Sequence, residues 1–363
     1  NVLVFDTTLR DGAQGRDVNF SLEDKKQVAH RLDDLGVDYI EAGWVPSNPK
    51  DTKFFQKFDQ EDLERAELVA LSSTRRPNTA PGEDKNLLGL LDSGAPVVGV
   101  VGKSWRLHVD EVLGVSPEEN LRMIADSVTY LREHDREVLY DAEHFFDGFK
   151  ADPQYALKTL NTAEEAGANV ICLCDTNGGT TPAEVGEIVN KARETVDSKL
   201  SIHAHDDSGL AVANSLVAVD TGVEVVQGTV NGYGERVGNA DLCTLVPDLV
   251  LKKGFNALGS RDSLEELTSV SRFVSEIANK QPEKRSPFVG VNAFSHKAGL
   301  HVDAVLKQPG TFEHVSPEEV GNERRFLVSE LSGGSTVERK LKSVGVDMDE
   351  KAQVHKDVLE NIK

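Results

Sequence analysis

The sequence of 363 residues lacks the features of secreted and membrane proteins. It contains three cysteines, too few for a disulfide framework in a chain of this length. No apolar run approaches the roughly 20 residues that a membrane-spanning helix needs. The first residues also lack the basic and apolar segments of a signal peptide. These absences predict a soluble protein of the cytoplasm.

Basic residues are scarce relative to acidic ones. The chain has 40 Lys and Arg residues against 61 Asp and Glu residues, which gives a formal net charge of −21. Such a surface repels phosphate backbones and anionic lipids, so we expect neither a nucleic-acid nor a membrane partner. The charge also suits a salt-rich cytoplasm, where ions screen the repulsion, but ordinary solubility accounts for it as well.

The chain does contain a regular alternation of apolar, β-rich runs with segments of helical period. The expected strands are Val2–Asp6, Tyr39–Ala42, Leu68–Ser72, Val97–Val101, Val138–Ala142, Val170–Cys174, Leu200–His205 and Val223–Val230. The expected helices include Ser21–Leu35, Pro117–Glu133, Pro153–Ala166, Pro182–Val196, Leu210–Thr221 and Leu242–Lys252. Eight strand–helix pairs in about 250 residues predict a closed (β/α)₈ TIM barrel. An open, doubly wound α/β sheet is the alternative.

The alternation stops after Gly254. We therefore expect a barrel domain over residues 1–258, a helical linker over 259–285 and a small, mostly helical C-terminal subdomain over 286–363. Within these segments, Ser263–Lys280 has the pattern of one amphipathic helix. The final stretch, Ser335–Lys363, is charged and is also expected to be helical.

In a barrel of this kind, functional side chains lie where the strands end. The first strand ends at Asp6 and is followed by Arg10, Asp11 and Gly12. A carboxylate followed by Arg-Asp-Gly fits a ligand beside a cation, since Arg10 could hold an anionic substrate or a developing enolate. A polar turn without function accounts for this segment equally well.

The end of the seventh strand gives a sharper signal. His203 and His205 are two residues apart in a strand, so both imidazoles face the same space. Two neutral imidazoles in this arrangement favour a divalent metal over a structural role. The loop after the eighth strand adds Asn239, whose amide oxygen is a further candidate ligand.

Other strand ends supply weaker candidates. Glu143 could act as an acid or a base, or lie on a solvated rim. Thr176 could orient a substrate oxygen, although its segment is also an ordinary turn into a helix. Cys172 and Cys174 could complete a zinc site with the histidines, but apolar packing inside the strand is favoured.

Three segments together resemble one family of enzymes. Asp6–Gly12, His203–His205 and Gly232–Asn239 resemble the barrel metallolyases (DRE-TIM) that condense acetyl-CoA with 2-oxoacids. Four further segments look most like the citramalate synthase branch: Gly102–Trp105, Tyr140–Gly148, Ser208–Ser215 and Asn322–Gly333. Isopropylmalate and homocitrate synthases belong to the same family.

The resemblance implies a set of residue roles. The metal ligands would be Asp6, His203, His205 and Asn239, around Mn²⁺, Zn²⁺, Co²⁺ or Mg²⁺. Arg10, Glu143 and His301 would be catalytic. The C-terminal segment that contains His301 would cover the mouth of the barrel. In a homodimer, this segment often covers the barrel of the neighbouring subunit. The remaining positions would bind or orient the substrates: Asp11, Gln14, Thr176 and Thr229.

The activity implied is that of an acyltransferase. Acetyl-CoA, the co-substrate, would condense with pyruvate to give citramalate, a step of isoleucine biosynthesis. Isopropylmalate or homocitrate synthesis and cleavage of a 3-hydroxyacyl-CoA are the alternative reactions. A metal- or metabolite-binding module without turnover is the alternative to an enzyme.

Overall fold

The computed structural model describes residues 1–58 and 60–327. The chain forms two compact units, the first containing residues 1–263 and 270–281 and the second residues 264–269 and those from 282 onward. The residues expected to form a linker, 259–285, are thus divided between the two units. None of the helices in the described ranges is long and apolar enough to cross a membrane.

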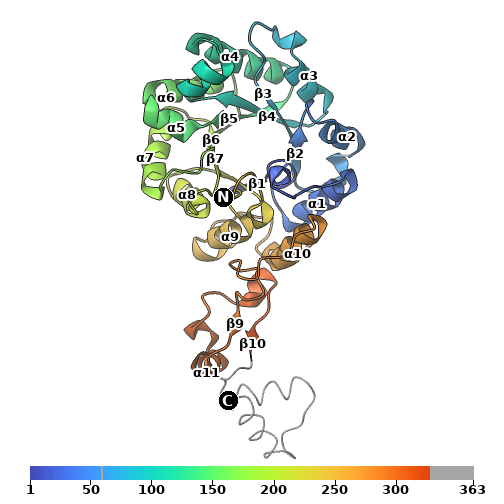
Figure 1. Ribbon diagram of the computed structural model, residues 1–363, viewed down its shortest axis with the longest axis vertical. Helices are drawn as coiled ribbons and strands as arrows, with labels where there is room; N and C mark the ends of the chain where they lie inside the picture. The colour runs from blue at the N-terminus through green and yellow to red at the C-terminus, as the bar shows by residue number, and fades with distance from the viewer. Residues whose placement is uncertain (59, 328–363) are drawn as a thin grey trace, which may run out of the picture. The chain divides into compact units, whose positions relative to one another are not determined.

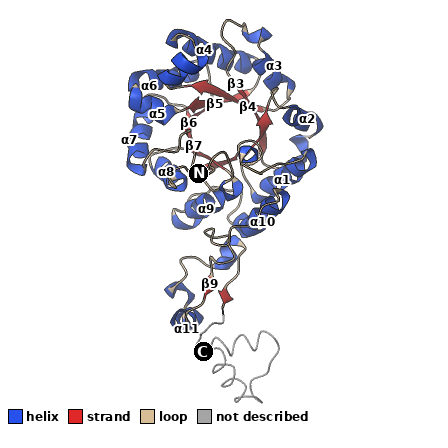
Figure 2. Ribbon diagram, in the orientation of Figure 1, coloured by secondary structure: helices blue, strands red, loops and turns tan. Residues whose placement is uncertain are grey.

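The first unit is a closed barrel of eight parallel strands, which the helices surround (Figures 1 and 2). The strands are β1 (Leu3–Asp6), β2 (Tyr39–Trp44), β3 (Glu67–Ser73), β4 (Val97–Lys103), β5 (Glu137–Glu143), β6 (Val170–Asp175), β7 (Lys199–Ala204) and β8 (Val225–Gly228). The ring closes where β1 pairs with β8, with Leu3 opposite Val225. The TIM-barrel prediction is confirmed, and the open-sheet alternative is wrong.

The helices begin close to where the sequence predicted. In the first unit they are α1 (Leu22–Leu35), α2 (Pro49–Lys57), α3 (Lys85–Asp92), α4 (Pro117–Glu133), α5 (Phe145–Ala151), α6 (Pro153–Glu165), α7 (Pro182–Arg193), α8 (Ala211–Asp220) and α9 (Leu242–Pro247). Ser21 caps α1 by accepting a hydrogen bond from the Asp24 backbone, while the Asp24 carboxylate accepts one from the Ser21 backbone. The single helix expected over 263–280 is instead a 3₁₀ turn followed by α10 (Leu267–Ile277).

Apolar side chains fill the barrel between the strands. Phe5, Val69, Leu139 and Val225, from four different strands, belong to one buried cluster. Side chains of strands that are not neighbours in the ring, such as β1, β3 and β5, can meet only inside the barrel, so this interior contains a packed core. The polar side chains described below lie beyond this apolar cluster, toward the ends of the strands.

The second unit, as far as residue 327, contains a short parallel pair, β9 (Ser295–His296) with β10 (Arg325–Phe326), and the helix α11 (Gly299–Lys307). A buried carboxylate, that of Glu313, links β9 to the residue that precedes β10. Glu313 lies 2.9 Å from Nε2 of His296 and accepts two hydrogen bonds from the guanidinium of Arg324. The helix expected over 335–363 lies outside the described residues.

A buried ion pair fixes the start of the barrel. Lys25 of α1 donates to the backbone oxygen of Ala42 in β2 at 2.7 Å and to the carboxylate of Asp51 in α2. The other oxygen of Asp51 accepts from the backbone N–H of Trp44 at 3.0 Å. Burial lowers the pKa of Lys25, and Asp51 opposes that shift. The pair therefore holds α1, α2 and the end of β2 in register.

We expect Asp51→Ala to lower the free energy of unfolding by about 3–5 kcal/mol, because it leaves the Lys25 ammonium buried without its partner. Urea denaturation of the native chain and the variant measures this change. The matched control is Glu194→Ala, which removes the partner of Lys191 from an exposed pair and should change stability much less. Equal effects of the two variants would contradict the assignment.

Candidate active site

The turn after β1 is anchored to the loop after β8. The carboxylate of Asp6 accepts hydrogen bonds from the backbone N–H and the hydroxyl of Thr8, both at 2.8 Å. The Thr8 oxygen in turn accepts from the backbone N–H of Val230, also at 2.8 Å. Burial raises the pKa of Asp6 to about 7. Asp6, expected as a metal ligand, thus orders the turn, and its carboxylate is not part of the cluster described next.

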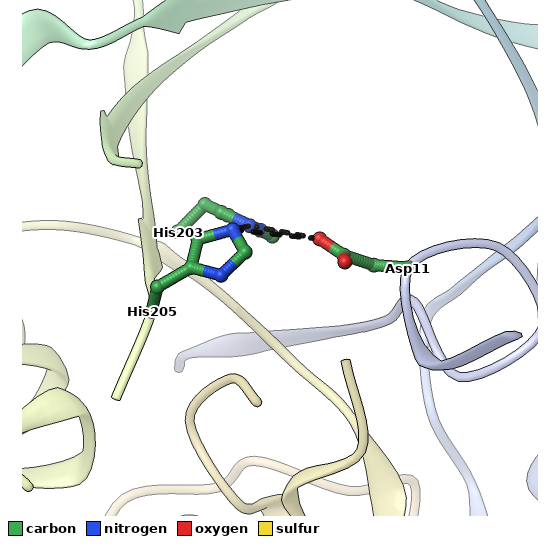
Figure 3. A group of neighbouring side chains, drawn as sticks. All are labelled: Asp11, His203 and His205. Carbon is green, nitrogen blue, oxygen red and sulfur yellow. Dashed lines mark hydrogen bonds and ion pairs between the residues drawn. The ribbon is translucent and has the colours of Figure 1, made fainter. Parts of the chain in front are cut away.

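That turn brings Asp11, rather than Asp6, to the two histidines. Figure 3 shows the side chains of Asp11, His203 and His205 pointing toward one another. Oδ2 of Asp11 lies 3.2 Å from Nε2 of His203 and 3.7 Å from Nε2 of His205. The two Nε2 atoms are 3.3 Å apart. All three side chains are buried, and their ligand atoms lie within 4.8 Å of one another.

The surroundings of the two imidazoles differ. Nδ1 of His203 lies 3.0 Å from Oε1 of Gln227, which in this orientation of the amide accepts the Nδ1 proton and leaves Nε2 facing the cluster. Burial lowers the pKa of His203, but the contact with Asp11 outweighs it and raises that pKa. Burial and the nearby His203 lower the pKa of His205 to about 3, which keeps this imidazole neutral. Burial alone would raise the pKa of Asp11, but Arg10 and His203 outweigh it and hold that pKa well below its usual range.

Asn239 completes the cluster from the loop after β8. A backbone bridge between His205 and Asn239 places this amide beside the histidines. Its nitrogen lies 3.0 Å from Oδ2 of Asp11 and 3.1 Å from Nε2 of His203. Its oxygen is buried and has no hydrogen-bond partner among the described residues. Rotating the amide by half a turn exchanges the two atoms and directs the oxygen at the cluster.

The four side chains therefore fit a divalent cation, with two imidazole nitrogens, one carboxylate oxygen and one amide oxygen. The loop after β8, which carries Asn239, requires a glycine at position 234. A Cβ atom on Gly234 would come within 1.9 Å of the side-chain oxygen of Asn239.

Arg10 is held beside this cluster by two carboxylates. Its Nε donates to Glu41 of β2, and its Nη1 lies 3.3 Å from Oδ2 of Asp11. Glu41 is 1% exposed. Burial raises the pKa of Glu41 to about 7, while contact with Arg10 opposes the rise. Glu41 was not among the residues expected from the sequence, although a lone carboxylate in the apolar run Tyr39–Trp44 was the available signal.

A cavity of about 90 Å³ opens against the cluster. Glu143, expected as an acid or a base, and Thr176, expected to orient a substrate oxygen, both line it. Glu143 pairs with Lys103, and the Thr176 hydroxyl oxygen accepts from the backbone N–H of His144 at 2.9 Å. The other lining residues are Arg10, Asp11, Trp44, Leu71, Val101, Asp141, Cys174, His203 and His205.

Three expected site residues lie elsewhere. The Thr229 hydroxyl donates to the backbone oxygen of Tyr233 at 2.6 Å, so it orders its own loop. Gln14 is exposed and lines a second cavity, of about 250 Å³, between the turn after β1 and α2. His301 belongs to the second unit, where its ring stacks on Phe312 with 4.0 Å between the centroids.

The two strand cysteines lie with a different partner. The ligand atoms of Cys172 and Cys174 group with those of Asp141 and not with the histidines. Burial raises the pKa of the Cys172 thiol, and Cys172 together with burial raises that of Cys174 well above its usual value. The two thiols therefore do not form one ligand group with the histidines; both are buried, Cys172 within β6 and Cys174 beside the inner cavity.

Known proteins resemble the whole chain. Residues 1–274 match the HMGL-like family, and residues 288–363 match the homocitrate synthase post-HMGL domain-like family. An (R)-citramalate synthase of Synechocystis sp. is 50% identical, over 99% of this chain and 67% of that protein. An (R)-citramalate synthase of Geobacter sulfurreducens is also 50% identical, over 100% of this chain and 68% of that protein.

A solved structure shares the fold. The HMG-CoA lyase of Bacillus subtilis superposes with a TM-score of 0.67 at 20% identity, over 78% of this chain and 96% of that one. Together with the matched family and the barrel geometry, these findings lead to one conclusion: the chain belongs to the HMGL-like family.

Proposed function

We propose that this chain condenses acetyl-CoA with pyruvate to give citramalate and free CoA. One observation carries the proposal: the cluster of Asp11, His203, His205 and Asn239 lies beside Arg10 in a chain that is 50% identical, over nearly its whole length, to (R)-citramalate synthases. The same residues would serve the reverse type of reaction, cleavage of a 3-hydroxyacyl-CoA.

In this proposal, Asp11, His203, His205 and Asn239 hold the divalent cation. When bound, the cation polarises the ketone of the oxoacid. The ionised Asp11 supplies the charge that retains the cation, and Gln227 fixes the tautomer of His203 that can bind it. The mixed nitrogen and oxygen donors accept Mn²⁺, Zn²⁺, Co²⁺ or Mg²⁺.

Arg10 acts on the acetyl group. A base removes a proton from the acetyl methyl, and the guanidinium stabilises the negative charge that develops on the thioester oxygen. The methyl carbon then attacks the ketone carbon of pyruvate, the former ketone oxygen takes up a proton, and water cleaves the thioester to release CoA. Glu41 and Asp11 hold the guanidinium in place for this role.

The other roles concern the oxoacid and the base. Thr176 and Glu143 both line the inner cavity. In this proposal, Thr176 binds the oxoacid and Glu143 assists proton transfer. His301 remains our candidate for the base. The homodimer, the sharing of His301 between subunits and the cytoplasmic location also remain predictions.

The shape and charge of the inner cavity favour pyruvate. Its volume is about 90 Å³, and the methyl group of pyruvate needs less room than the branched side chain of 2-oxoisovalerate. Two carboxyl groups, Asp141 and Glu143, line this cavity and offer no cation of their own to a second substrate carboxylate, as in 2-oxoglutarate.

Thiol release from acetyl-CoA with a panel of 2-oxoacids tests the reaction. We expect kcat/KM for pyruvate to exceed that for 2-oxoisovalerate by about 10–200-fold, the range that added carbon groups produce in tight pockets. Higher activity with 2-oxoisovalerate or 2-oxoglutarate would refute the choice of pyruvate. Metal binding without release from any oxoacid would favour a binding module, and cleavage of 3-hydroxyacyl-CoA would favour a lyase.

His203→Ala tests the cation site. We expect the variant to lose most of its bound metal and nearly all turnover, because the remaining ligands no longer fix the geometry. Elemental analysis after dialysis gives the metal content per chain. His30→Ala, which removes an exposed histidine of α1, is the control and should retain metal and activity. Full metal occupancy in His203→Ala would remove His203 from the site.

Arg10→Lys separates charge from geometry. Lysine keeps the positive charge but cannot contact Glu41 and Asp11 with a planar fork, so we expect kcat to fall about 10²–10³-fold. Metal content should stay unchanged, since Arg10 is not among the ligands. Turnover within a few-fold of the native chain would show that the guanidinium is not needed.

A further inference from the structure

A second group of ligand-type side chains lies inside the barrel, and the proposed reaction does not use it. Asp141 of β5 and Cys172 and Cys174 of β6 are buried, and their ligand atoms lie within 4.8 Å of one another. Asp141 is opposite Cys172 in the sheet, and Cys174 is two residues further along, so all three share one face. Leu139 and Val170, which precede them on that face, belong to the apolar cluster. The group therefore lies at the strand-end side of the core.

The spacing of the two sulfur atoms matches a metal–thiolate site. Sγ of Cys172 and Sγ of Cys174 are 3.9 Å apart. In a tetrahedral zinc site with Zn–S bonds of about 2.3 Å, two sulfurs lie roughly 3.8 Å from each other. The strand thus already holds both sulfurs at the distance that one bound cation requires.

The group is open on one side and supported on another. Cys174 and Asp141 line the inner cavity, which gives a cation a route of entry and leaves room for a water molecule as a further ligand. Ser201 of β7 is opposite Cys172 in the sheet. Its buried hydroxyl interacts with the Cys172 thiol and has no other partner among the described residues. A hydroxyl in this position stabilises the deprotonated sulfur that a cation needs.

The donor atoms distinguish this group from the catalytic cluster. The cluster offers nitrogen and oxygen donors, whereas Asp141, Cys172 and Cys174 offer two sulfurs and one oxygen. Thiolates select soft cations such as Zn²⁺, while Mg²⁺ and Mn²⁺ prefer oxygen. Both thiols have raised pKa values, so a cation binds by displacing a proton from each sulfur to the solvent. Only a cation with high affinity for sulfur completes this exchange.

We propose that Asp141, Cys172 and Cys174 form a second cation site, selective for thiophilic divalent cations, and that a cation bound there obstructs the inner cavity and inhibits the enzyme. The binding part of this inference is independent of the proposed function. The inhibition rests on the proposed function, because it assumes that the oxoacid occupies the inner cavity.

Cd²⁺, a soft analogue of Zn²⁺, is the probe. We expect calorimetry to give two Cd²⁺ per native chain and one per chain of Cys172→Ser, which should also lose the ultraviolet absorption band of a cadmium–thiolate bond. Cys243→Ser is the matched control, because Cys243 is a buried cysteine of α9 outside this group, and it should retain both cations and the band. His203→Ala should retain the band and lose the other cation.

Inhibition is measured as thiol release at saturating Mn²⁺. Cd²⁺ should inhibit the native chain, and Cys172→Ser should keep the basal activity. The Cd²⁺ concentration that halves activity should rise at least about tenfold in this variant, because loss of even a supporting contact weakens metal sites about 10–100-fold. Added Mg²⁺ should affect the two chains equally.

The outcomes separate this inference from the proposed function. Absence of the cadmium–thiolate band in the native chain, or an equal band in a folded Cys172→Ser, would overturn the site. Should Cys172→Ser fail to fold, Cys174→Ser replaces it in the binding measurements, and a retained band overturns the site there too. Equal inhibition of the native chain and Cys172→Ser would refute obstruction of the cavity. Absence of thiol release by the native chain would refute the proposed function, while the band and the stoichiometry would still decide whether the site exists.

Discussion

The carboxylate of Asp11 is the group on which the site depends, because it contacts Arg10 on one side and both histidines on the other. Burial raises the pKa of Glu41 to about 7 and also raises that of Asp141, while the nearby Arg10 opposes both shifts. A divalent cation held at Asp11 would add positive charge to this site and would favour binding of the oxoacid carboxylate.

Closure of the barrel gives Asp11 its position. The pairing of β1 with β8 brings the turn that carries Asp11 next to the loop that carries Asn239. The hydrogen bonds from Val230 to Thr8 and from Thr8 to Asp6 then fix the turn against that loop. On the other side, the backbone N–H of Ala240 donates to the Ala204 oxygen of β7 at 3.0 Å. The ligands therefore come from three neighbouring strand ends, and the backbone itself sets their spacing.

Local patterns predicted those parts of the molecule that local forces determine. The alternation of strands and helices, the Ser21 cap and the shared face of His203 and His205 all follow from periodicity and nearest neighbours. The choice between Asp6 and Asp11 does not, because the path of the turn depends on hydrogen bonds to a loop more than 200 residues away along the chain. Glu41 was missed for the same reason, since its partner Arg10 meets it only once β1 and β2 are paired.

The position of Arg10 links the barrel to the proposed chemistry. In the proposed reaction, its guanidinium lies beside the acetyl group while the methyl carbon attacks the ketone carbon. The guanidinium can serve there only if it does not move when either substrate binds. Its buried partners Glu41 and Asp11 come from two different segments, β2 and the turn after β1, and hold the guanidinium from both. A lysine in this position would lack the second contact, which explains why the site uses an arginine.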